Sequence, residues 1–314
     1  MNRSRVLAFA QLLRIPNVFT AFADIAVGAC VAVAVLPAFP GALAAAFVLI
    51  ALASGCLYCA GMVWNDVFDL AEDTVSRAFR PIPSGRVRTV TAVLLGTVLM
   101  ACGLALAAAA GALGEGEWNY EPLVYAGGIA VAVFAYDGGL KRTFIGPIAM
   151  GTCRYLNVLF GLALVPESYF DLDFKLPLAA VVGVYIVGVT WFARTEEGES
   201  RARNLRLAFL VILAALVTAL VLRAKLHDTK PFHTLGTVLF PYLLVAFGFL
   251  VGLPAARAIG EPSSKRVQKA VKRMVLGLVV LDAVLATMFV GAWGLLVVLL
   301  LLPAMLLGKW VYST

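Results

Sequence analysis

The chain has 314 residues, of which 62% are hydrophobic and 14% are charged, and its formal net charge is +7. Ordinary soluble domains contain about 45–50% apolar and about 25% charged residues. This composition therefore argues against a soluble enzyme, a disordered chain and a nucleic-acid-binding domain. Apolar windows of about 20 residues, the length that crosses a bilayer, recur along the chain and predict an all-α, polytopic membrane protein.

About nine windows are predicted to cross the membrane, and a last apolar stretch is either a tenth crossing or the continuation of the ninth. The nine windows lie near residues 15–37, 41–64, 89–112, 122–136, 143–165, 177–193, 205–222, 236–256 and 270–290, and the last stretch is 292–309. No large soluble segment is inserted between them. We therefore expect residues 1–314 to form a single transmembrane domain.

Basic residues concentrate in every second loop, and this pattern orients the predicted bundle. They precede the first window, separate the second from the third, the fourth from the fifth and the sixth from the seventh, and fill residues 257–273. The alternate loops are neutral or acidic, except that residues 223–230 carry Arg223, Lys225 and Lys230. By the positive-inside rule, we expect an integral protein of the cytoplasmic (inner) membrane with its N-terminus and basic loops in the cytoplasm. The net positive charge then requires no nucleic-acid partner.

The basic loop after the second window contains an acidic segment that predicts a site for chemistry. On a helix with about 100° per residue, Asp66, Asp69 and Asp73 lie within roughly 60° of one another. Carboxylates so placed repel one another unless a cation lies between them, and oxygen ligands of this kind suit Mg²⁺, which often also binds substrate phosphates. Arg77 and Arg80 are suited to phosphate oxygens. The segment predicts a magnesium-diphosphate site on the cytoplasmic side; the alternative is a solvated loop of mixed charge.

Three motifs resemble signatures of the UbiA superfamily of intramembrane prenyltransferases, which includes the 4-hydroxybenzoate polyprenyltransferases. They are Asn65-Asp66-x-x-Asp69-x-x-x-Asp73 followed by Arg80-Pro-Ile-Pro-Ser-Gly85, Arg14-Ile-Pro-Asn17, and Tyr136-Asp-Gly-Gly-Leu-Lys141-Arg142. The resemblance spans roughly residues 14–206. It implies a bundle of nine helices around a central cavity open to lipid, in which two Asp-rich motifs bind a prenyl diphosphate through Mg²⁺.

The second Asp-rich motif of the family is altered in this chain. Where the family usually has Asp-x-x-x-Asp, the sequence reads Thr195-Glu196-Glu197-Gly198-Glu199. The resemblance makes Glu199 the preferred metal ligand and Glu196 the next, with Arg203 on the same helical face. One Mg²⁺ is expected. Because Thr195 replaces an acidic residue, the binding of a second Mg²⁺ stays an open question. The alternative that these glutamates are solvated loop charges also stays open.

Ionisable residues inside the predicted spans are costly and are functional by default. Asp24 shares a face of the first span with Asn17, whereas Arg154 and Asn157 lie in the fifth. Either Asp24 and Arg154 form a buried pair that holds the bundle together, or they shape the acceptor or diphosphate end of the cavity. Asp282, in the ninth span, is expected to be structural.

The resemblance to the family implies the expected reaction, Mg²⁺-dependent transfer of a prenyl group from its diphosphate to an aromatic or other lipophilic acceptor in the membrane. The candidate catalytic residues are Asp66, Asp69, Asp73, Lys141 and Arg154. The candidate substrate-binding residues are Asn17, Asp24, Asn65, Arg77, Arg80, Lys141, Arg142, Arg154, Asn157 and Arg203. Two alternatives remain: a secondary transporter that uses Asp24, Arg154 and Asp282, and an enzyme resembling CDP-alcohol phosphotransferases.

Overall fold

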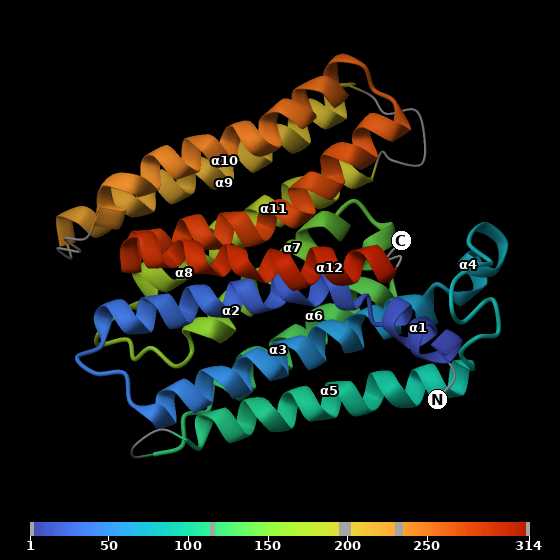
Figure 1. The fold of residues 1–314 in the computed structure, drawn as a ribbon, viewed down its shortest axis with the longest axis horizontal. Helices are drawn as coiled ribbons and strands as arrows, with labels where there is room; N and C mark the ends of the chain where they lie inside the picture. Colours follow the sequence, from blue (N-terminus) through green and yellow to red (C-terminus); the bar gives the residue numbers. More distant parts are fainter. Residues whose placement is uncertain (1–2, 114–116, 195–201, 230–234, 312–314) are drawn as a thin grey trace.

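The computed structural model describes residues 3–113, 117–194, 202–229 and 235–311, which fold into one bundle of helices (Figure 1). The described residues form no strand, so the predicted all-α class is confirmed. The α-helices are α1 (Arg3–Leu12), α2 (Ile15–Val35), α3 (Gly41–Phe68), α4 (Leu70–Ser76), α5 (Thr89–Gly111), α6 (Glu121–Gly138), α7 (Gly146–Leu162), α8 (Leu172–Ala193), α9 (Ala202–Thr229), α10 (Leu235–Gly260), α11 (Ser264–Val290) and α12 (Leu301–Trp310), with 3₁₀ segments η1 (Leu140–Arg142) and η2 (Gly291–Leu300).

The apolar windows fold as helices because hydrocarbon offers no partner to a backbone N–H or C=O group outside the segment itself. Proline in the first turn, where its missing N–H costs nothing, begins α2, α6 and α7. Several helices extend past the predicted windows into polar sequence; α8 and α9, predicted as 177–193 and 205–222, are the clearest cases.

Seven helical segments in the described ranges are long and apolar enough to cross a membrane. They are Ile15–Val35, Gly41–Phe68, Thr89–Gly111, Leu172–Ala193, Ala202–Leu226, Val238–Gly260 and the combined segment Ser264–Trp310. Helices α6 and α7, expected as the fourth and fifth spans, have 18 and 17 residues and are not among the seven. Both pack against α3 and against each other, so they belong to the same bundle.

The last apolar stretch turns back along α11 instead of continuing it. The turn is at Gly291, whose φ of 64° is in the region that favours glycine. Gly294 then lies so close to α11 that a Cβ there would be 2.5 Å from the backbone nitrogen of Thr287. The end of α12 reaches the start of α2, since a Cβ at Gly308 would be 3.9 Å from the Pro16 side chain.

The N-terminus, α1, α4 and the C-terminus lie at one end of the bundle, and the turn between α2 and α3 lies at the other (Figure 1). Basic loops meet at the first end. The guanidinium of Arg86 donates to the Gln11 side chain of α1 at 2.8 Å, and that of Arg194 donates to the Lys141 carbonyl at 2.7 Å. The predicted gathering of basic loops on one side is therefore seen among these segments.

Candidate active site

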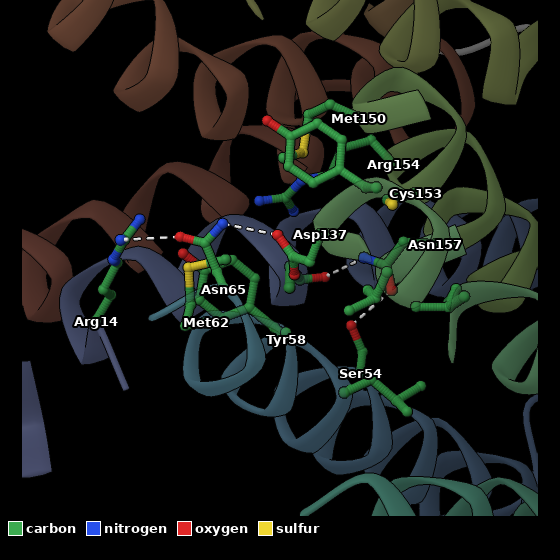
Figure 2. A pocket seen from close by; sticks show the side chains of 16 residues that line it. Arg14, Ser54, Tyr58, Met62, Asn65, Asp137, Met150, Cys153, Arg154 and Asn157 are labelled. Carbon is green, nitrogen blue, oxygen red and sulfur yellow. Dashed lines mark hydrogen bonds between the residues drawn. The ribbon is translucent and has the colours of Figure 1, made fainter. Parts of the chain in front are cut away.

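A cavity of about 210 Å³ lies between α2, α3, α6 and α7 (Figure 2). Its walls are mostly apolar, and they carry a few polar groups from different helices. In Figure 2, Arg14 and Asn65 lie on one side of the view, and Ser54 and Asn157 lie on the other. The lining residues are Arg14, Ala21, Ser54, Leu57, Tyr58, Gly61, Met62, Asn65, Ile129, Val133, Tyr136, Asp137, Met150, Cys153, Arg154 and Asn157.

Helical spacing explains how the chain builds these walls. On α3, Ser54, Tyr58, Met62 and Asn65 follow one another at intervals of three or four residues, which places them on one face. The α7 residues that line the cavity, from Met150 to Asn157, share the same periodicity. Each helix therefore directs one stripe of side chains into the cavity.

The acidic segment changes direction at Asp69, which separates α3 from α4. The backbone of Asp69 has φ −89° and ψ 2°, outside the α-helical geometry of its neighbours. Asp66 and Asp73 face a common guanidinium, that of Arg80, whereas Asp69 faces Lys141. The three carboxylates do not share one continuous helical face as the sequence predicted, because the helix does not continue through Asp69.

Arg80 links the ends of the acidic segment. Its Nη1 atom lies 2.7 Å from Asp73 Oδ2 and 3.4 Å from Asp66 Oδ1, and all three residues are buried. Arg14, which has an uncommon positive φ of 47° between α1 and α2, places Nη2 3.1 Å from Asp66 Oδ1. Arg77 lies 3.7 Å from Asp73 Oδ1. Basic side chains thus neutralise the buried carboxylates.

Lys141 connects the acidic segment to the cavity. Its Nζ atom lies 2.7 Å from Asp69 Oδ1 and 3.4 Å from Asp137 Oδ1. Asp137 is also held by Asn65, whose Nδ2 atom donates to the same oxygen at 2.7 Å. Arg142 is largely exposed and lies 3.5 Å from Asp69 Oδ1.

A second polar network lies deeper in the bundle and joins α2, α3 and α7. Asp24 is fully buried, and its Oδ2 atom accepts hydrogen bonds from Arg154 Nη1 at 3.1 Å and Asn157 Nδ2 at 2.8 Å. Arg154 also donates to Thr20 Oγ1 at 2.6 Å, and Ser54 donates to Asn157 Oδ1 at 2.6 Å. Arg154 and Asn157 line the cavity as well, so the two alternatives for the Asp24–Arg154 pair are compatible with each other.

Asp282 lies against this network. It is fully buried in α11, which packs against α2, and neither of its carboxylate oxygens has a hydrogen-bond partner among the described residues. The guanidinium of Arg154 also lies over the ring of Tyr58, 5.5 Å from its centre. Asn17, near the start of α2, accepts a hydrogen bond from Thr20 Oγ1 through its backbone oxygen at 2.7 Å. Of the intramembrane residues that the sequence singled out, Arg154 and Asn157 line the cavity, and Asp24 contacts both of them from behind the wall.

The acidic segment fits Mg²⁺ in its chemistry, although its carboxylates are spread over two sides. Within residues 3–113, 117–194, 202–229 and 235–311, no three acidic, histidine or cysteine side chains are close enough to hold a metal ion together. The available donors are nevertheless carboxylate oxygens, the ligands that Mg²⁺ prefers. Asp73 Oδ1 is buried and accepts no hydrogen bond from the described residues. Its ion pair with Arg77, at 3.7 Å, is longer than a hydrogen bond, so this oxygen retains an electron pair for a metal ion.

Three expected site residues belong to the altered second motif or to the start of α9. Glu196 and Glu199 lie outside the described residues, as does Thr195. Arg203 is exposed near the start of α9. The proposed second metal-binding motif is thus not described.

The sequence pattern did not mark Asp137 as a site residue, although Asp137 lines the cavity. A signal for Asp137 was present, because it precedes Lys141 by four residues and i,i+4 pairs of opposite charge face each other on a helix. Three aromatic residues near the acidic segment, Tyr58, Trp64 and Phe68, were candidates to stabilise a cation, and of these Tyr58 lines the cavity.

Comparison with known proteins places this site in a family context. A model of the UbiA prenyltransferase family matches residues 21–261. Among solved structures, a UbiA homologue from Archaeoglobus fulgidus bound to GPP and Mg²⁺ has a TM-score of 0.62 at 13% identity and covers 93% of this chain and 99% of its own. A structure described as giving insights into digeranylgeranylglyceryl phosphate synthase in membranes has a TM-score of 0.63 at 19% identity, covering 92% and 98%. These identities support the fold alone.

Two curated relatives are named digeranylgeranylglyceryl phosphate synthase. The protein from Saccharolobus solfataricus is 31% identical over 155 residues, covering 49% of this chain and 50% of the relative. That from Metallosphaera sedula is 33% identical over 154 residues, again 49% and 50%. The match therefore spans about half the length of these relatives.

Proposed function

Because the chain belongs to the UbiA prenyltransferase family and is an integral membrane protein, we propose that it transfers a prenyl group. The donor would be a prenyl diphosphate and the acceptor a lipophilic molecule. This membership favours the prenyltransferase over the transporter and the CDP-alcohol phosphotransferase-like enzyme. We further propose that residues 1–314 act as one transmembrane domain, with the site at the cytoplasmic side where the basic loops meet.

One observation supports the proposal above the others. Lys141 Nζ contacts both Asp69 of the acidic segment, at 2.7 Å, and Asp137 of the cavity wall, at 3.4 Å. A single ammonium group therefore joins a segment suited to a diphosphate with a cavity suited to an apolar substrate. A prenyl diphosphate has these two parts, a charged head and an apolar chain.

The proposed roles of the charged residues follow from their positions. Arg77, Arg80, Lys141 and Arg142 contact carboxylates, and in the complex they would also donate hydrogen bonds to the diphosphate oxygens. Asp66, Asp69 and Asp73 face two different basic side chains in the structure. In the complex, their carboxylates would have to draw together to supply oxygen ligands to Mg²⁺, which would neutralise the charge that develops on the leaving diphosphate. Fixed donors directed at developing charge stabilise a transition state without reorganisation.

The cavity wall would protect the reacting carbon. As the bond to the diphosphate lengthens, the allylic carbon becomes cationic, and the rings of Tyr58 and Tyr136 line the cavity where they can stabilise it. Apolar side chains around them exclude water, which would otherwise capture the cation. We propose that the prenyl chain enters from the lipid and that Arg154 and Asn157 orient the acceptor.

Binding of labelled C10, C15 and C20 prenyl diphosphates to the purified protein in lipid tests this function. We expect Mg²⁺-dependent binding that is lost in Asp69→Asn, because that substitution removes the carboxylate charge next to Lys141. Glu72→Gln is the matched control, since Glu72 is 58% exposed in α4 and lies 3.6 Å from Arg142. Absence of binding at every chain length, with folded protein and Mg²⁺ present, would contradict the proposal.

A further inference from the structure

Asp137 is the one acidic side chain among the residues that line the cavity, within the part of the chain that the structure describes. Its side chain is 4% exposed, so it is directed into the protein and away from bulk water. Asp66 borders a different pocket, beside Gln11 and Phe79. Any proton released inside the cavity therefore has one carboxylate that can receive it directly.

The carboxyl group of Asp137 is held by one oxygen and leaves the other available. Oδ1 accepts from Asn65 Nδ2 at 2.7 Å and lies 3.4 Å from Lys141 Nζ. Both of these contacts are made by Oδ1 and not by Oδ2. Two contacts on one oxygen orient the group, and the second oxygen can accept a hydrogen bond from a bound molecule.

Asp137 is also near the diphosphate end of the cavity, because Lys141 contacts both Asp137 and Asp69. A prenyl diphosphate bound there would have its reactive carbon, which is attached directly to the diphosphate, close to Asp137. A proton acceptor must lie within hydrogen-bonding distance of the proton that it removes, and this position meets that need.

The opposite end of the cavity can hold the polar part of an acceptor. Ser54, Arg154 and Asn157 line it, and their side chains are fixed by the network around Asp24 (Figure 2). An acceptor with its polar group there could place a hydroxyl toward Asp137 along the cavity.

We propose that Asp137 accepts the proton of a hydroxyl-bearing acceptor, so that the prenyl group is joined to oxygen; this rests on the prenyl transfer proposed above. The hydroxyl proton passes to Oδ2 of Asp137, and an electron pair of the hydroxyl oxygen forms the bond to the first prenyl carbon. The bond between that carbon and the diphosphate oxygen breaks, and its electron pair leaves with the diphosphate. The substrate class is then an alcohol or phenol with a lipophilic body.

The test uses the full chain in lipid vesicles with labelled geranylgeranyl diphosphate and Mg²⁺. The acceptor probes are mono-geranylgeranyl glyceryl phosphate, a long-chain primary alcohol and a 4-alkylphenol, each compared with its O-methyl ether. Donor Kd and the initial rate of transfer are measured for the wild type, Asp137→Asn, Asp137→Glu and the control Asp173→Asn, whose side chain is exposed at the start of α8.

We expect Asp137→Asn to bind the donor with a Kd within about threefold of wild type and to transfer at least about 100-fold more slowly, the lower range for loss of a general base. Asp137→Glu should regain part of the rate, the methyl ethers should not react, and Asp173→Asn should match the wild type. If Asp137→Asn does not fold, Asp137→Glu serves as the test instead. Slower transfer by Asp137→Glu than by the wild type, with unchanged donor binding, would support the proposal in the same way.

Several results would overturn the proposal. Transfer by Asp137→Asn at the wild-type rate would show that Asp137 takes no proton. Loss of donor binding together with transfer would make it a donor-site residue. Wild-type protein that binds the donor but joins the prenyl group to no hydroxyl probe, or only to a ring carbon, would refute the acceptor class. Wild-type protein that fails to bind the donor would instead refute the proposed function.

Discussion

Replacing Arg154 by methionine should destabilise the bundle, because it leaves the buried carboxylate of Asp24 without its cation. Asp24 is fully buried, and Arg154, whose side chain is 15% exposed, lies 3.1 Å from it. Methionine keeps much of the length of the side chain and removes the charge. The substitution therefore isolates the electrostatic part of the contact.

The expected magnitude follows from what remains around Asp24. Removing one partner of a buried ion pair costs about 3–5 kcal/mol. The hydrogen bond from Asn157 Nδ2 persists at 2.8 Å, and bonds to charged groups contribute about 1.5–3 kcal/mol. We therefore expect Arg154→Met to lower the free energy of unfolding by about 3 kcal/mol. Combining it with Asp24→Asn removes the isolated charge, so the double variant should be more stable than Arg154→Met alone.

The assay is a double-mutant cycle in mixed micelles, with unfolding by increasing SDS followed by circular dichroism. Arg257→Met, at an exposed position in α10, controls for the loss of a surface cation and should change the free energy of unfolding little. If the losses of the two single variants simply add in the double variant, Asp24 and Arg154 are not energetically coupled and the argument fails.

Three further outcomes are expected. Lys141→Met should weaken prenyl diphosphate binding by about 10–100-fold, because Lys141 Nζ lies 2.7 Å from Asp69; an unchanged Kd in calorimetric titration would count against its role. Gly28→Val should lower the free energy of unfolding by about 1–3 kcal/mol or more, since a Cβ there would lie 2.2 Å from the Gly161 carbonyl oxygen. The control Gly41→Ala should be neutral, because a Cβ at Gly41 meets no atom within 4 Å. Chelation by EDTA should abolish donor binding and added Mg²⁺ should restore it; binding that survives EDTA would argue against carboxylate-held metal.

The local part of the site could be predicted because its members are close in the chain. Asp66, Asp73 and Arg80 lie within one short segment, and the structure brings them together around the Arg80 guanidinium. The turn at Asp69 was not predicted, because a helical pattern alone does not show where Lys141, 72 residues later, will contact the segment. The direction of a side chain at a helix end depends on such partners.

The sequence by itself determined that this chain is a helical membrane protein, because windows of about 20 apolar residues must satisfy their backbone hydrogen bonds internally in lipid. It also determined that an acidic segment lies among basic residues at a loop. Tertiary structure alone decided that Asp137 faces the cavity, that Asp24 meets Arg154, and that the last stretch turns back at Gly291. The physical reason is that helices such as α5 are apolar on every side, so periodicity does not mark the inward face. Close approaches such as Gly28 against Gly161 set helix rotation instead.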